Sequence, residues 1–196
     1  MSTILTNRLK NHVDSTLRDL MYLDDCANDA ENTYSRGLVA ICLAGLSGYG
    51  YAQVVHHVTD GPKDNGIDGA LFDSGRNKLY LVQSKWSKKG TGTIETGELR
   101  KFLAGVYDLL NEEWAKFNKR FKAIAPSISA GIRKDPEIVL VAAYNSDNPI
   151  SPECQSIIKR LFGREQLRFP GGCLLQDVRS EASGQDDEDR KVRSQI

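Results

Sequence analysis

Two short apolar runs separated by a turn-forming cluster constrain this chain more than any other feature. They lie in the segment GIDGALFDSGRNKLYLVQSKW, which runs from Gly66 to Trp86. The runs IDGALF and KLYLVQSKW are rich in the apolar and aromatic residues of strands. DSGRNK between them supplies Asp, Ser, Gly and Asn, which favour tight turns. The segment therefore predicts a β-hairpin.

The length of the turn decides which side chains meet across this hairpin. If Asp73 pairs with Lys78 around a four-residue turn, Asp68 lies directly opposite Gln83. A two-residue turn keeps the same register, whereas an odd number of residues would move every side chain to the other face. An even turn therefore brings a carboxylate and an amide together at the far end of the hairpin.

Alternation along the second strand places a lysine beside this pair. Side chains of a strand point to opposite faces in turn, so Gln83 and Lys85 share the face of Leu79 and Leu81. The opposite face is then formed by Tyr80, Val82, Ser84 and Trp86. An acid, an amide and an ammonium group thus converge at the end of an apolar strand.

Such a group suits a hard cation and a phosphate. Mg²⁺ prefers oxygen ligands from one or two carboxylates and keeps its other positions for water and substrate phosphate. Asp68 and Gln83 can supply such ligands. Lys85 can orient or deprotonate an attacking water and offset charge on a phosphodiester.

The rest of the chain predicts helices on both sides of a mixed sheet, an α/β fold. Apolar periodicity predicts helices over about 3–23, 31–46 and 95–111, and helical spacing continues over 114–126. EIVLVAAYN (137–145) reads as a strand covered on both faces, and a helix with Pro152 in its first turn follows it. Periodicity does not decide whether YGYAQVVHHV is a strand or a short helix.

Composition favours one domain without a membrane segment. A chain of 196 residues with a formal net charge of zero fits a single core and shows no overall bias toward nucleic acid. We expect a domain over 1–179, with an N-terminal helix in 1–25 and the core in 31–146, and a disordered tail or linker over 180–196. No apolar run spans a bilayer and no signal peptide is recognisable, so we expect a cytoplasmic protein. The four scattered cysteines suggest neither a disulfide framework nor a zinc site.

The order Asp68, Gln83, Lys85 resembles the active-site signature of the PD-(D/E)XK nuclease superfamily, in its Gln-x-Lys variant. That superfamily has a restriction-endonuclease-like fold, a mixed β-sheet flanked by helices. The resemblance implies that Asp68, Gln83 and Lys85 are catalytic and that Asp68 and Gln83 bind the metal. Members often carry a further acid on the helix before the hairpin, and Glu31 is the best match for that ligand.

A closer likeness covers roughly 34–146. DNGIDGALFD, LYLVQSKWSKKGTGTI, ELRKFLAGVYDLL, FNKRFKAIAPSI and EIVLVAAYNS together are similar to the N-terminal nuclease-like region of AIPR (abortive infection phage resistance) proteins. This likeness implies a metal-dependent endonuclease of bacterial anti-phage defence, using Mg²⁺ with Mn²⁺ as a substitute. DNA is favoured over RNA as the substrate, and a homodimer is a further expectation. The departure is Gln83, a weaker Mg²⁺ ligand than a carboxylate.

Each candidate residue also has a plainer explanation. For Asp68 it is turn or strand-entry chemistry, in a loop KDNGID whose Asp64, Asn65 and Gly66 only shape the backbone. Lys85 could protect an edge strand, and Glu31 could serve the dipole of its helix. Lys88 and Lys89, beside two glycines, could bind a phosphate backbone or lie in a solvated loop. The corresponding functional alternatives are a nuclease-like module that binds nucleic acid or a partner without cutting, and a sensor for a downstream effector domain.

Overall fold

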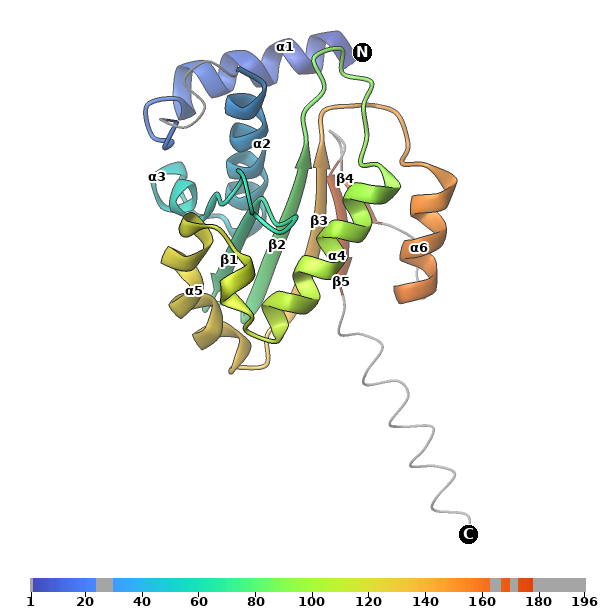
Figure 1. Cartoon of the computed structure of the whole chain (residues 1–196). Helices are drawn as coiled ribbons and strands as arrows, with labels where there is room; N and C mark the ends of the chain where they lie inside the picture. Colours follow the sequence, from blue (N-terminus) through green and yellow to red (C-terminus); the bar gives the residue numbers. More distant parts are fainter. Residues whose placement is uncertain (1, 24–29, 163–166, 170–172, 178–196) are drawn as a thin grey trace.

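A five-stranded mixed sheet forms the centre of the protein. The computed structural model describes residues 2–23, 30–162, 167–169 and 173–177, so the predicted tail over 180–196 lies outside the described residues. The strands lie in the order β1-β2-β3-β5-β4 (Figure 1). β1 and β2 are antiparallel, β2 and β3 are parallel, and β5 is antiparallel to both β3 and β4. The bounds are β1 Gly69–Asp73, β2 Lys78–Lys85, β3 Glu137–Tyr144, β4 Leu167–Phe169 and β5 Cys173–Asp177.

Helices cover both faces of this sheet, which confirms the predicted α/β class (Figure 1). One core cluster joins α4, α5 and α6 to Leu79 and Leu81 of β2, and a second joins the N-terminal helices to Tyr80 and Val82. The predicted alternation of β2 is therefore confirmed. The helices are α1 Ser2–His12, α2 Ala30–Ser47, α3 Tyr51–Val54, α4 Thr96–Leu110, α5 Lys119–Ile132 and α6 Pro152–Phe162. Short turns of other helix types cover Val13–Leu17 (η1), Val55–His57 (η3) and Trp114–Lys116 (η4).

The ambiguous segment YGYAQVVHHV is helical. It forms α3 and η3 and then joins the sheet edge through a single bridge between Val58 and Gly69. Buried Val54 packs in the core cluster that α2 also enters. No single helix among the described residues is long and apolar enough to cross a bilayer, although α2 together with Tyr51–His57, bent by 117°, passes that test of length and composition.

The helical spacing predicted over 114–126 is divided between two elements. A short 3₁₀ turn at Trp114–Lys116 precedes α5, which begins after Asn118 because that side chain accepts a hydrogen bond from Phe121 N over 2.9 Å. The helix continues past Pro126 to Ile132, so the expected end at this proline is wrong. Buried Ile124 and Ile128, on either side of the proline, hold α5 against the sheet.

Candidate metal centre

The hairpin has the register that brings Asp68 to Gln83. Asp73 pairs with Lys78 around a four-residue turn, and Gly69 pairs with Val82. Asp68 N extends the pairing by donating to Val82 O over 2.8 Å. The turn is fixed by the Asp73 carboxylate, which accepts from the backbone N–H groups of residues 75 and 76. The even-length turn predicted from the sequence is thus confirmed.

The Asp68 side chain is buried, and one of its carboxylate oxygens accepts three hydrogen bonds. It is 4 % exposed. Its Oδ2 accepts hydrogen bonds from Gln83 Nε2 at 3.0 Å, Ser84 N at 2.6 Å and Ser84 Oγ at 2.9 Å. Three donors on one oxygen fix the direction of the carboxylate, because each bond restricts the same two side-chain torsions.

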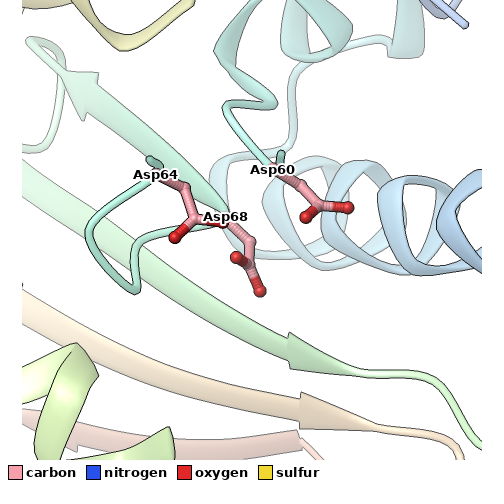
Figure 2. Close-up of side chains that lie close together, drawn as sticks. All are labelled: Asp60, Asp64 and Asp68. Carbon is pink, nitrogen blue, oxygen red and sulfur yellow. The ribbon is translucent and has the colours of Figure 1, made fainter. Parts of the chain in front are cut away.

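Two further aspartates approach Asp68 from the loop before β1. Asp60, Asp64 and Asp68 each place a carboxylate oxygen within 4.8 Å of the others, and Figure 2 shows the three side chains together. Burial first, and then the negative charges of Asp60 and Asp64, raise the pKa of Asp68 well above its usual value, against the Ser84 hydrogen bonds that lower it. This group, which we call the aspartate cluster, concentrates negative charge in a buried place.

The loop geometry that positions Asp64 is specific. Asp64 Oδ1 accepts from Gly66 N at 2.7 Å and from Lys101 Nζ at 2.9 Å. Gly66 has a φ of +80°, a left-handed value that glycine adopts without a steric cost. Asp64 therefore shapes the loop, as expected of it, and the same carboxylate also belongs to the aspartate cluster.

Asp60 is anchored through its backbone by two arginines. Its carbonyl oxygen accepts from Arg36 Nη2 at 3.0 Å and from Arg120 Nη1 at 2.8 Å. Arg36 Nε also lies 3.8 Å from Asp60 Oδ2. Arg36 comes from α2 and Arg120 from α5, so helices on opposite faces of the sheet fix the position of this aspartate.

The donor set fits a divalent cation. Gln83 gives its amide N–H₂ to Asp68 Oδ2 and Ser84 O. Its Oε1 is buried, and no described residue donates a hydrogen bond to it. A cation held by the three aspartates would offset the charge of the aspartate cluster, and Gln83, whose amide contacts Asp68, carries the buried amide oxygen that lacks a donor among the described residues. Carboxylates with one amide oxygen are hard ligands suited to Mg²⁺, Mn²⁺ or Ca²⁺.

Lys85 lies on the predicted face of the sheet, that of Leu79 and Leu81, and its side chain contacts α4. Its ammonium group forms an ion pair with Glu98, which raises the pKa of Lys85 above its ordinary value. Glu98 Oε2 also accepts from Glu95 N at 2.9 Å and so caps the start of the helix. β2 lies between β1 and β3, so protection of an edge strand does not explain this lysine.

Glu31 and Lys88 lie together, outside the aspartate cluster. Glu31 is in the first turn of α2 and forms an ion pair with Lys88. Lys88 and Lys89 are both exposed in the loop after β2. Glu31, the expected further metal ligand, is therefore not among the carboxylates that the structure gathers around Asp68.

Sequence reasoning missed the metal-binding potential of Asp60 and Asp64. A signal was present, because Asp60, Asp64 and Asp68 follow one another at intervals of four residues in TDGPKDNGID. Comparison of the chain with protein-family models, curated proteins and solved structures finds no match.

Proposed function

We propose that the protein is a metal-dependent endonuclease that hydrolyses phosphodiester bonds of nucleic acid. The observation that carries the proposal is the aspartate cluster beside the buried, unsatisfied Gln83 Oε1. Asp68 and Gln83, with Asp60 and Asp64, would hold a divalent cation, and the donor chemistry favours Mg²⁺ with Mn²⁺ as a substitute. When bound, this ion would supply Lewis-acid activation of the phosphoryl group.

The protein's own side chains have separate tasks in this proposal. The three hydrogen bonds to Asp68 Oδ2 keep the carboxylate in place before substrate arrives. Lys85, released from Glu98, would donate a hydrogen bond to a nonbridging phosphate oxygen and offset the charge that develops there. Glu98 raises the pKa of Lys85 in the metal-free protein, and a lysine released from that partner also stays cationic at neutral pH, which suits charge stabilisation rather than proton abstraction.

The strand arrangement supports a restriction-endonuclease-like fold. The antiparallel pair β1-β2 is followed, through α4 and α5, by β3 parallel to β2. Asp68 lies at the start of the hairpin, and Gln83 and Lys85 lie at the end of its second strand, as in the PD-(D/E)XK signature. DNA as the preferred substrate and a role in anti-phage defence rest on the resemblance to AIPR proteins.

A binding module without activity is the second candidate. It is favoured because the acidic side chains already have basic partners in the protein. Lys101 pairs with Asp64, Arg36 lies near Asp60, and Lys85 pairs with Glu98. In that case the same fold binds nucleic acid, and these basic side chains offset the negative charge of the aspartate cluster in place of a metal ion.

Cleavage of labelled single-stranded and duplex DNA and RNA separates the two candidates. We expect products with Mg²⁺ or Mn²⁺, none with EDTA, and a loss of at least roughly a hundredfold in Asp68→Asn, the size seen for loss of one key electrostatic group. An unchanged rate in Asp68→Asn would overturn the proposal. Binding of nucleic acid that is indifferent to metal, with no cleavage, would establish the module instead.

A further inference from the structure

A cavity of about 860 Å³ adjoins the aspartate cluster at the β1 edge of the sheet. Its lining comes from the segment after η1, from η3 and the loop that follows, and from the start of α5. The residues that matter for its chemistry are Leu20, Tyr22, Asp60, Lys119 and Arg120. Asp60 belongs to both the cavity and the aspartate cluster, so a ligand in one lies beside the other.

The cavity combines exposed apolar surface with positive charge. Leu20 is 43 % exposed and Tyr22 is 61 % exposed, and both line it. Arg120 Cζ lies 4.8 Å from the centre of the Tyr22 ring. Lys119 is exposed, and no described residue forms an ion pair with it. Exposed aromatic rings beside lysine and arginine are the usual surface for unstacked bases and their phosphates.

Hydrogen bonds through the backbone hold this surface in place. Arg36, which is 2 % exposed, donates from Nη1 to Tyr22 O at 3.0 Å and from Nη2 to Asp60 O at 3.0 Å. Asn118 Nδ2 donates to Thr59 O at 2.7 Å. The aromatic wall, the aspartate loop and the start of α5 are therefore tied together before any ligand binds, which lowers the entropy cost of binding.

We infer that this cavity binds one unpaired nucleotide of a single-stranded nucleic acid. The base would lie against Tyr22 and Leu20, with its phosphate near Lys119 and Arg120. In the metal-bound protein the adjacent phosphodiester would lie at the aspartate cluster. The volume is within the range of about 300–1,000 Å³ for ligand pockets. A paired base is covered by its neighbours in the duplex stack, so only an unpaired or extruded base can enter. The choice of a polynucleotide rests on the proposed function.

Fluorescence anisotropy with a labelled oligonucleotide in EDTA tests this inference without requiring cleavage. We expect the wild-type chain to bind single-stranded DNA or RNA more tightly than a duplex of the same composition. Tyr22→Ala should weaken binding roughly five- to a hundredfold, the range for loss of one base–aromatic contact. Tyr22→Phe keeps the ring and should stay within about twofold. Lys119→Ala should weaken binding and reduce its dependence on salt.

Matched controls lie elsewhere on the described surface. Tyr107→Ala removes an aromatic ring that is 68 % exposed on α4, and Lys122→Ala removes an exposed lysine of α5; neither residue lines the cavity. Both should bind like the wild type. The inference is overturned by absent binding, by equal or tighter binding of duplex, or by equal losses in Tyr22→Ala and Tyr107→Ala. It is also overturned if a free mononucleotide binds as tightly as the oligonucleotide. Binding as expected, without cleavage in Mg²⁺, would refute the proposed activity and leave the cavity inference standing.

Discussion

Gln83 Nε2 donates a hydrogen bond to Asp68 Oδ2 over 3.0 Å, and this contact joins the two ends of the hairpin. The bond uses the amide nitrogen, so the amide oxygen is left buried and without a donor among the described residues. It also adds to the hold on a carboxylate whose pKa is raised by burial and by Asp60 and Asp64. Burial of these two polar groups therefore lowers the stability of the metal-free protein, and a bound cation would offset part of that loss.

Substitution of Asp68 by asparagine should stabilise the metal-free fold at neutral pH. The folded-state pKa of Asp68 is raised above 3.8, so the folded chain holds a proton that the unfolded chain has released. Stability should then fall as pH rises from about 3.8 through the folded pKa. Asparagine Oδ1 can replace Oδ2 as the acceptor and does not ionise. Thermal unfolding from pH 4 to pH 8 in EDTA should show a higher midpoint for Asp68→Asn and a flatter pH dependence.

Mg²⁺ should reduce this difference in stability between Asp68→Asn and the wild type. At ten times the dissociation constant, a ligand that binds only the folded state adds about 1.4 kcal/mol, and Asp68→Asn should gain much less. A wild-type protein that is more stable than Asp68→Asn in EDTA at pH 7 would contradict this prediction. It would show that groups of the protein already stabilise the ionised Asp68 carboxylate without a metal ion.

Two lysines of β2 allow a matched test of Lys85. Lys85 pairs with Glu98 and Lys78 pairs with Glu137, and the four side chains are 31 to 33 % exposed. Because partly exposed ion pairs contribute about 0–1 kcal/mol, Lys85→Met and Lys78→Met should change stability similarly and little. Only Lys85→Met should reduce cleavage, by roughly a hundredfold or more. Equal cleavage by the two variants would remove Lys85 from the mechanism.

Lys101 should oppose metal binding. Its Nζ lies 2.9 Å from Asp64 Oδ1, and its side chain is 59 % exposed. Removal of a unit charge close to a cation is worth about 1 kcal/mol at 4 Å in water, so Lys101→Met should tighten Mn²⁺ binding by about fivefold. Lys116→Met, which breaks the pair with Asp108, is the control and should leave Mn²⁺ affinity unchanged. Weaker binding in Lys101→Met would contradict this view of the cluster.

Gly105 of α4 should be essential to the loop that carries Asp64. A methyl group at Gly105 would lie 2.0 Å from Asn65 O, whereas Gly97 in the same helix has open space around it. Gly105→Ala should cost about 1–3 kcal/mol through overpacking, measured by chemical denaturation, and should weaken Mn²⁺ binding. Gly97→Ala should be neutral or slightly stabilising. A neutral Gly105→Ala would mean that the loop adapts without moving Asp64.

The hairpin could be predicted because its signals are local. The turn residues set an even loop, and the alternation of β2 then placed Gln83 and Lys85 on one face. Helices on both faces of the sheet could be predicted from apolar periodicity and from the continuous apolar strand, whereas which helix covers which face is seen only in the structure. The segment around α3 could not be assigned, because a short apolar run fits either a strand or a helix.

The aspartate cluster could not be predicted with the same reasoning. Its loop needs positive φ at Lys63, Asn65 and Gly66, and it needs Arg36, which lies 24 residues before Asp60. The partner of Lys85 was equally beyond reach, because Glu98 meets it only through the packing of α4 on the sheet. Contacts between distant segments, rather than local propensity, complete the candidate site.

Titration of Mn²⁺ into the protein, followed by electron paramagnetic resonance of the free ion, tests the central claim most directly. We predict saturable binding with a dissociation constant in the millimolar range or tighter, lost in Asp68→Asn and retained in Asp73→Asn, a turn aspartate of the same hairpin. Absent binding, or equal binding by the wild type and Asp68→Asn, would contradict the account.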